Sequence, residues 1–291
     1  MSREQQNQPY MQVPAKTVTV NGVSYAYREM GPKGGVPVVF LIHLAGTMDN
    51  WDPRIIEPIA AKHHVITFSN RGVGASTGSV PDSIEAMADD AAAFIQALGY
   101  PTVDLFGFSL GGMIAQSLVL KHPSLVRKLV LAGTGPAGGE GIQKIIGTTY
   151  YDVVRGALTR QDPKEFLFFN RNAAGKTAAR AFINRLKERT TNREAPIKLK
   201  AFQTQLQAIR RWGLSPSADL GVITQPTLIA NGDNDRMVPS VLSSDMHRRI
   251  PGSELVIYPD SGHGGIFQFH DRFVPVALEF LGRSFVGPLI R

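Results

Sequence analysis

Short apolar runs alternate with amphipathic stretches along the first half of the chain. The apolar runs are continuous, as in strands buried on both faces, and comprise Val38–Ile42, Val65–Phe68, Val103–Phe106 and Leu129–Ala132. Helical patterns separate them, from Asp52 to about Lys62, from Ser83 to about Leu98 and from Gly111 to about Lys121. Alternating strands and helices are typical of a parallel sheet covered on both faces. We therefore predict an α/β fold with a mostly parallel, doubly wound sheet.

Turn and capping residues set the expected boundaries of several elements. Asn21-Gly22 lies between two β-prone runs and predicts a hairpin, because both residues tolerate a positive φ. Asp82-Ser83-Ile84-Glu85 has the pattern of a capping box at the start of a helix. Gly99 is expected to end that helix.

The alternation stops near Gly135 and resumes about 90 residues later, at Thr227. Four helical stretches follow, at about Ile142–Val154, Pro163–Phe169, Ala178–Arg189 and Pro196–Trp212. Strand and helix patterns then return at Thr227–Ala230, Ser243–Arg249, Leu255–Tyr258 and Arg272–Leu281. One sheet interrupted by a helical insertion is the simplest interpretation.

A candidate nucleophile lies where a predicted strand meets a predicted helix. The segment Gly107–Gly111 fits the pattern G-x-S-x-G, with Ser109 at its centre. A nucleophile on a sharp strand-to-helix turn needs small neighbours, because adjacent backbone passes close by. A glycine-rich turn without catalytic function is the alternative, and the strand before and helix after the motif favour a nucleophile.

A serine nucleophile needs a base and an acid that orients the base. His263 follows the last predicted strand, whereas a surface or capping position explains five other histidines better, namely His63, His64, His122, His247 and His270. The acid is expected in the loop after Thr227–Ala230, where both Asp233 and Asp235 are candidates. Asp260 lies too close to His263 in sequence to be the first choice.

Backbone amides near the motif are candidates for stabilising an oxyanion. The amide of Leu110 follows the nucleophile, and the amide of Leu44 lies in the loop after the strand that ends at Ile42. His43 is interpreted as structural support for this loop. Apolar residues beside the motif loops predict an apolar substrate pocket, with Trp51, Phe108 and Met113 as candidates.

Composition and charge exclude several classes of function. The chain has no cysteine, which excludes disulfides, thiolate metal sites and a cysteine nucleophile, and it contains no metal-binding motif. Gly175-Lys176-Thr177 resembles the end of a phosphate-binding loop but lacks the glycine five residues earlier. We expect no metal and no cofactor. The sequence also has no apolar run of about 18 residues and no apolar leader, so we expect a cytoplasmic protein that binds no membrane.

The net charge of +7 comes from one segment. Residues 140–212 contain 15 basic and 6 acidic residues, and the rest of the chain carries a small negative charge. A solvated helix face explains this excess better than nucleic-acid binding does. Attraction of substrates with a distal carboxylate is a second interpretation of the same charge.

These motifs together resemble the α/β-hydrolase fold superfamily over nearly the whole chain. The matching features are the Gly107–Gly111 motif, the loop from His43, the Arg71–Ser76 turn, the Asn231–Pro239 loop and Gly262-His263. The resemblance implies a helical cap over residues 136–215 and a core of residues 1–135 and 216–291. It also implies that the second aspartate of the acid loop, Asp235, is the triad acid.

The motif around Ser109 looks like those of esterases, enol-lactonases and cofactor-free perhydrolases. We therefore expect a serine hydrolase that cleaves a small-molecule carboxylic ester or lactone through an acyl-enzyme. A perhydrolase or C–C bond hydrolase is the first alternative, and a slow-turnover small-molecule receptor is the second. Because the motif carries a serine, the members of the superfamily that use an aspartate nucleophile at this position are excluded. Leu44 replaces the usual glycine after His43, which narrows the expected acyl pocket.

Overall fold

The computed structural model describes residues 8–284 and contains one eight-stranded sheet, in the order β1-β2-β4-β3-β5-β6-β7-β8. The strands are β1 (Lys16–Val20), β2 (Val23–Met30), β3 (Val38–Leu41), β4 (Val65–Phe68), β5 (Val103–Phe108), β6 (Val126–Ala132), β7 (Thr227–Gly232) and β8 (Glu254–Tyr258). β2 pairs antiparallel with both β1 and β4, and every pair from β4 to β8 is parallel. The predicted fold class is confirmed.

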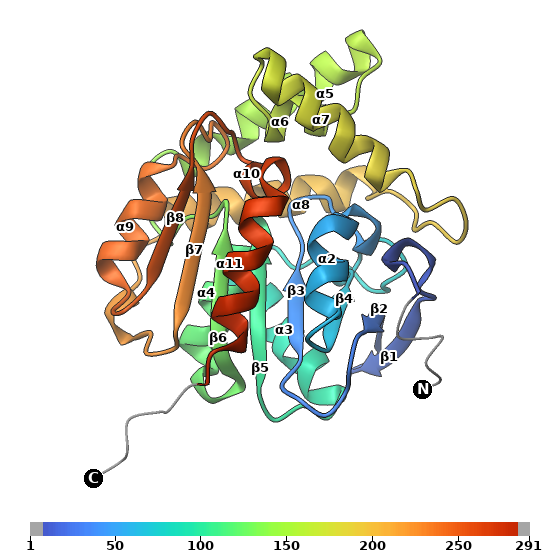
Figure 1. Ribbon diagram of the computed structural model, residues 1–291, viewed down its shortest axis with the longest axis vertical. Coiled ribbons are helices and arrows are strands. Elements are labelled where there is room, and N and C mark those ends of the chain that lie inside the picture. The colour runs from blue at the N-terminus through green and yellow to red at the C-terminus, as the bar shows by residue number, and fades with distance from the viewer. Residues whose placement is uncertain (1–7, 285–291) are drawn as a thin grey trace.

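Helices cover both faces of this sheet (Figure 1). The core helices are α2 (Pro53–Ala60), α3 (Ile84–Ala97), α4 (Leu110–Lys121), α9 (Val241–Arg249), α10 (Gly265–Gln268) and α11 (His270–Gly282). α2 packs against α11, and α3 packs against α4. β3, β4 and β5 are buried along their whole length, which explains why they appear in the sequence as continuous apolar runs.

The turn and capping residues agree with the sequence except at α3. Asn21 and Gly22 have φ values of 49° and 78°, as the predicted hairpin requires, and Gly99, at φ 82°, follows α3. The capping box at residues 82–85 was predicted one residue too early. Ser83 is the N-cap and accepts from the amide of Ala86 at 3.2 Å, and alanine has no side-chain group to complete the box.

The insertion folds into four α-helices, α5 (Ile145–Thr159), α6 (Pro163–Phe168), α7 (Ala173–Leu186) and α8 (Leu199–Leu214). α5, α6 and α7 project beyond one end of the sheet, and α8 lies between them and the sheet in this view (Figure 1). We refer to residues 136–215 as the cap. α7 begins at Ala173, earlier than the predicted Ala178, because Asn172 caps it by accepting from the amide of Gly175 at 2.8 Å.

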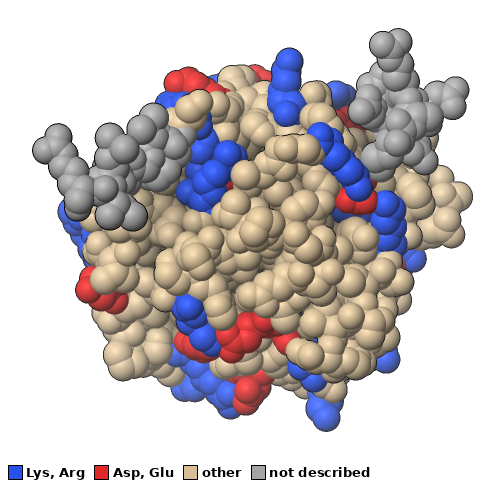
Figure 2. Space-filling model, turned by 90° about the horizontal axis from the view of Figure 1, so that it is seen from below, with Lys and Arg blue, Asp and Glu red and all other residues tan. Residues whose placement is uncertain are grey.

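Charged side chains are distributed differently over the two ends of the molecule. On the face opposite the cap, Lys and Arg are interspersed with Asp and Glu, and neither sign dominates the part that is described (Figure 2). Several cap arginines are instead paired with core carboxylates, in the ion pairs Arg185–Asp52, Arg189–Asp49 and Arg211–Asp82. Among residues 8–284, no helix combines the length and apolar character needed to cross a bilayer.

Candidate active site

Ser109 lies on a sharp turn between the end of β5 and the start of α4. Its φ and ψ values are 56° and −117°, a conformation that non-glycine residues rarely adopt. The amide of Ser109 donates to the carbonyl oxygen of Ala132 at 2.9 Å, and the hydroxyl of Thr134 donates to the Ser109 carbonyl at 2.9 Å. These bonds hold the strained turn against β6, so the Ser109 side chain projects from the sheet edge.

The glycines around Ser109 are required by close backbone contacts. A Cβ atom at Gly107 would lie 2.5 Å from the carbonyl oxygen of Gly111. A Cβ atom at Gly111 would lie only 1.8 Å from the carbonyl oxygen of Leu41, at the end of β3. The spacing of the motif therefore reflects two places where backbone passes within contact distance, as the sequence argument assumed.

The structure brings Ser109, His263 and Asp235 into one hydrogen-bonded chain. The Nε2 atom of His263 lies 2.9 Å from the Ser109 Oγ, and its Nδ1 lies 2.7 Å from the Asp235 Oδ2. His263 follows β8, and Asp235 follows β7, so both side chains come from loops at the same sheet edge as Ser109. All three residues are at least nine-tenths buried.

The other two aspartates considered from the sequence lie elsewhere. Asp233 accepts from the amide of Ser261 at 3.2 Å, and Asp260 accepts from the Asn172 side chain at 2.7 Å. Asp235 is held toward His263 because its other oxygen, Oδ1, accepts from the amides of Met237 and Val238 at 2.8 and 2.9 Å. Of the three candidates, only Asp235 is hydrogen-bonded to the imidazole.

This arrangement fixes the direction of each hydrogen bond. An ionised carboxylate only accepts, so Nδ1 of His263 donates to Asp235. Nε2 is then free to accept the proton of the Ser109 hydroxyl. The geometry is that of a nucleophile within reach of a general base, which is in turn oriented by an acid.

The two residues whose amides are the candidate oxyanion donors have different settings in the structure. Leu110 is the first residue of α4, so its amide belongs to the helix N-terminus, where amides lack a partner within the helix. Leu44 lies in the loop after β3 and lines the same cavity as Ser109. The Nδ1 of His43 donates to the Leu44 carbonyl at 2.7 Å, and burial lowers the pKa of His43 to about 3. His43 is therefore neutral near pH 7 and braces this loop.

A cavity of about 160 Å³ opens next to Ser109. The core supplies His43, Leu44, Ala45, Ser109, Met237 and His263 to its wall, and the cap supplies Thr149, Val153, Asp162, Pro163, Lys164, Leu167, Phe168 and Phe202. The apolar character expected of the pocket comes mainly from the cap. Lys164, the one cap cation in this wall, already lies 3.3 Å from the carboxylate of Asp162.

The three predicted pocket residues do not line this cavity. Trp51, Phe108 and Met113 are fully buried in the core. Trp51 packs edge-on against Phe40, with ring centroids 5.1 Å apart. Phe108 is the last residue of β5, and its ring lies behind His263 at 5.1 Å. The prediction was wrong because closeness to the motif in sequence does not determine on which side of the backbone a side chain points.

Comparison with known proteins identifies the family of this chain. Residues 36–269 match the family described as the alpha/beta hydrolase fold. The chain belongs to the α/β-hydrolase fold family. The structure of an alpha/beta hydrolase fold protein from Chitinophaga pinensis is 35% identical in sequence, with a TM-score of 0.88, and the match covers 95% of this chain and 100% of that one.

Two curated relatives also match along most of their length. The protein named "Putative carbamate hydrolase RutD" from Pantoea ananatis is 28% identical over 86% of this chain and 90% of its own. The protein named "Putative non-heme bromoperoxidase BpoC" from Mycobacterium tuberculosis is 25% identical over 89% of this chain and 97% of its own. The chain is thus a member of a hydrolase family with varied chemistry.

Sequence reasoning missed the cap residues of the cavity wall. On α6, Pro163, Lys164, Leu167 and Phe168 share one face, at spacings of one, three and four residues. That periodicity identifies a buried face, but it does not say which surface the face covers. Within the described part of the chain, no three His, Asp or Glu side chains gather as a metal site would require.

Proposed function

We propose that this protein hydrolyses small carboxylic esters or lactones through an acyl-enzyme formed on Ser109. The hydrogen-bonded chain from Ser109 through His263 to Asp235, at the floor of a cavity, carries this proposal. It is the arrangement of an activated serine nucleophile.

The steps follow from the positions of these groups. His263 takes the proton of Ser109 as Oγ attacks the substrate carbonyl carbon, and Asp235 stabilises the resulting imidazolium. The amides of Leu44 and Leu110 donate to the oxyanion that forms. The imidazolium then protonates the leaving group, which leaves an acyl group on Ser109. A water molecule activated by His263 hydrolyses that ester.

The cavity favours substrates with a short, apolar acyl group. Its volume of about 160 Å³ is small, and Val153, Leu167, Phe168 and Phe202 face it. Carbamates are a second candidate class, because a 28% identical relative carries that name and a carbamate carbonyl would be attacked in the same way. A perhydrolase would use the same acyl-enzyme with hydrogen peroxide in place of water, in line with the bromoperoxidase name of another relative.

A fluorophosphonate probe and a substrate panel test the proposal. The probe should label Ser109 alone, as peptide mapping would show, and Ser109→Ala should lower kcat on p-nitrophenyl acetate by about 10⁶-fold. Ser79→Ala, at an exposed serine, is the matched control and should retain full activity. Label on another residue, or an active Ser109→Ala protein, would refute the assignment.

The same panel separates the alternatives. Multiple turnovers of short esters or lactones support a hydrolase, whereas a single burst of one equivalent per protein indicates a slow-turnover receptor. Carbamates are tested beside esters of equal acyl length. Peracid formation in the presence of hydrogen peroxide would indicate the perhydrolase reaction.

A further inference from the structure

The loop that follows β3, residues 43–48, is held by side chains from the cap. We call it the oxyanion loop, because the proposed function gives the amide of Leu44 the role of an oxyanion donor. Within the loop, the amide of Gly46 donates to the His43 carbonyl at 3.0 Å, which fixes the peptide unit that carries the Leu44 N–H. The orientation of the next peptide unit depends on a residue outside the loop.

Gln205 of the cap helix α8 supplies that contact. Its side chain is fully buried, and its Oε1 accepts from the amide of Ala45 at 2.8 Å. The carbonyl of the same peptide unit, that of Leu44, accepts from His43 at 2.7 Å. The Leu44–Ala45 peptide is therefore held at both ends, once by the core and once by the cap.

Ala45 needs this support because its backbone is strained. Its φ is 61°, in the left-handed region that disfavours residues with a Cβ atom. Such a conformation persists only where surrounding contacts determine it. Without the bond from Gln205, the amide of Ala45 would lose its partner, and the loop could relax toward an ordinary φ and turn the neighbouring Leu44 amide.

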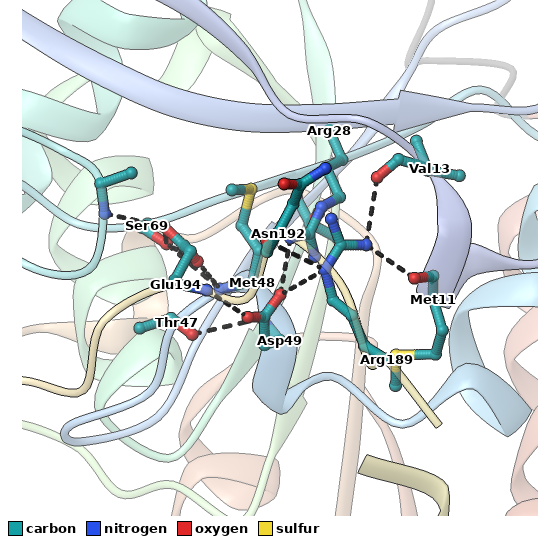
Figure 3. A network of polar contacts seen from close by, with 12 residues as sticks. Met11, Val13, Arg28, Thr47, Met48, Asp49, Ser69, Arg189, Asn192 and Glu194 are labelled. Carbon is teal, nitrogen blue, oxygen red and sulfur yellow. Dashed lines mark hydrogen bonds and ion pairs between the residues drawn. The ribbon is translucent and has the colours of Figure 1, made fainter. Parts of the chain in front are cut away.

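Glu194 holds the other end of the oxyanion loop (Figure 3). It lies between α7 and α8, and its carboxylate accepts from the amide of Met48 at 3.0 Å and from the amide of Ala75 at 2.9 Å. The hydroxyl of Ser69 donates to the same carboxylate at 2.7 Å. The amide of Glu194 in turn donates to Asp49 at 2.6 Å.

A buried arginine fixes the segment that carries Glu194. Arg189 donates to the carbonyls of Met11 and Val13 at 2.7 and 3.2 Å and lies 3.3 Å from the carboxylate of Asp49 (Figure 3). Asp49 also accepts from Arg28 at 2.6 Å. This network joins the cap to the core directly beside the oxyanion loop.

We propose that Gln205 and Glu194 are positioning residues that set the oxyanion loop for catalysis. They act through the backbone of residues 44–48 and touch no reacting atom. The proposal rests on the proposed function, since it concerns the amide of Leu44. It implies that the cap must be docked on the core for the oxyanion hole to take its active shape.

Gln205→Met tests the first contact at nearly constant side-chain volume. Loss of one oxyanion donor lowers kcat by roughly 10²–10³-fold, so a misplaced donor should cost roughly 10- to 100-fold with little change in KM. Gln205→Glu keeps an oxygen at the Oε1 position and should restore most of the activity. Gln207→Met, at an exposed glutamine of the same helix, is the matched control.

Glu194→Gln tests the second contact without changing shape. Its amide NH₂ would face one of the two N–H groups that now donate to the carboxylate. Either Ala75 would lose its acceptor, or Met48 would keep only the Ser69 hydroxyl, at 3.1 Å. We expect a fall in kcat in the same direction as for Gln205→Met. Glu188→Gln, at an exposed glutamate just after α7, is its control.

A transition-state readout separates positioning from simple structural support. The inhibition constant of a trifluoromethyl ketone, whose hemiketal oxyanion occupies the hole, should rise by the same factor as kcat falls. The rate of Ser109 labelling by a fluorophosphonate should fall in parallel, and this assay needs no known substrate.

Unchanged kcat and inhibitor affinity in folded Gln205→Met and Glu194→Gln would overturn the proposal. A lower melting temperature with unchanged kcat would do the same. If Gln205→Met does not fold, Gln205→Glu and Glu194→Gln decide the outcome. Loss of the Ser109 assignment itself would appear as activity or labelling that survives Ser109→Ala, which is a separate result.

Discussion

Replacing Arg185 should weaken the attachment of the cap more than replacing any exposed cap arginine. Arg185 lies on α7, and its Nε and Nη2 donate to the two carboxylate oxygens of Asp52 at 2.9 and 2.6 Å. Asp52 is fully buried and also caps α2 by accepting from the amide of Arg54 at 3.0 Å. In Arg185→Met, the carboxylate of Asp52 would keep the Arg54 amide and lose both hydrogen bonds from the guanidinium.

The size of the effect follows from the burial of Asp52. Removing one partner of a buried ion pair leaves an uncompensated charge, which costs roughly 3–5 kcal/mol. In a chain of 291 residues, such a loss lowers the melting temperature by roughly 5–8 °C. Arg185→Met/Asp52→Asn should recover most of the stability, because the neutral amide can still cap α2.

Circular dichroism during thermal and urea unfolding measures the effect. Arg211→Met is the control, since Arg211 pairs with Asp82 where both side chains are more than half exposed. That variant should unfold at the wild-type temperature, because exposed ion pairs contribute little. Equal losses in the two variants, or no recovery in the double variant, would refute the argument from burial.

Three further predictions follow from the site. Asp235→Asn should lower kcat by roughly 10⁴-fold and Asp233→Asn far less, because the carboxylate of Asp235, and not that of Asp233, holds His263 in the required tautomer. The reverse order of effects in steady-state assays would make Asp233 the triad acid. His43 stays neutral when folded, with its pKa lowered to about 3, whereas the unfolded chain takes up a proton below about pH 6.5. The contribution of neutral His43 to the free energy of unfolding is complete above that pH and is lost as the pH falls toward 3. In urea titrations between these pH values, the free energy of unfolding of the wild type should therefore fall by up to about 1.4 kcal/mol per pH unit more than that of His43→Gln. Equal pH dependence of the two free energies would contradict this. Because Lys164 is paired with Asp162, kcat/KM for an ester with a distal carboxylate should change less than about 2-fold, relative to a neutral ester, between about 20 and 300 mM salt; a larger fall would show steering by the cap charge.

The parts of the fold and site that the sequence predicted are those governed by local physics. The strands buried on both faces appear as continuous apolar runs, and the Ser109 turn appears as a fixed glycine spacing, because a Cβ atom at Gly111 would collide with Leu41. Ser109, Asp235 and His263 come together because each follows a parallel strand and the ends of these strands share one edge. Choosing Asp235 over Asp233 needed the family resemblance, since both lie in the same loop.

The parts that could not be predicted depend on contacts between distant segments. Gln205 reaches Ala45 across 160 residues, and Glu194 reaches Met48 across 146. Nothing in the local sequence distinguishes Gln205 from the exposed Gln207 two residues later except its place on the buried face of α8. Which core groups contact the buried face of α8 depends on how the cap packs on the core.

The two proposals together give α8 of the cap two linked roles. Phe202 faces the cavity and Gln205 faces the oxyanion loop, and the two are less than one turn apart on α8. A substitution that shifts α8 to fit another acyl group also moves the acceptor that holds the amide of Ala45. Under the two proposals, substrate fit and transition-state stabilisation are coupled through one helix, although the hydrogen-bonded chain from Ser109 to Asp235 is built entirely from the core.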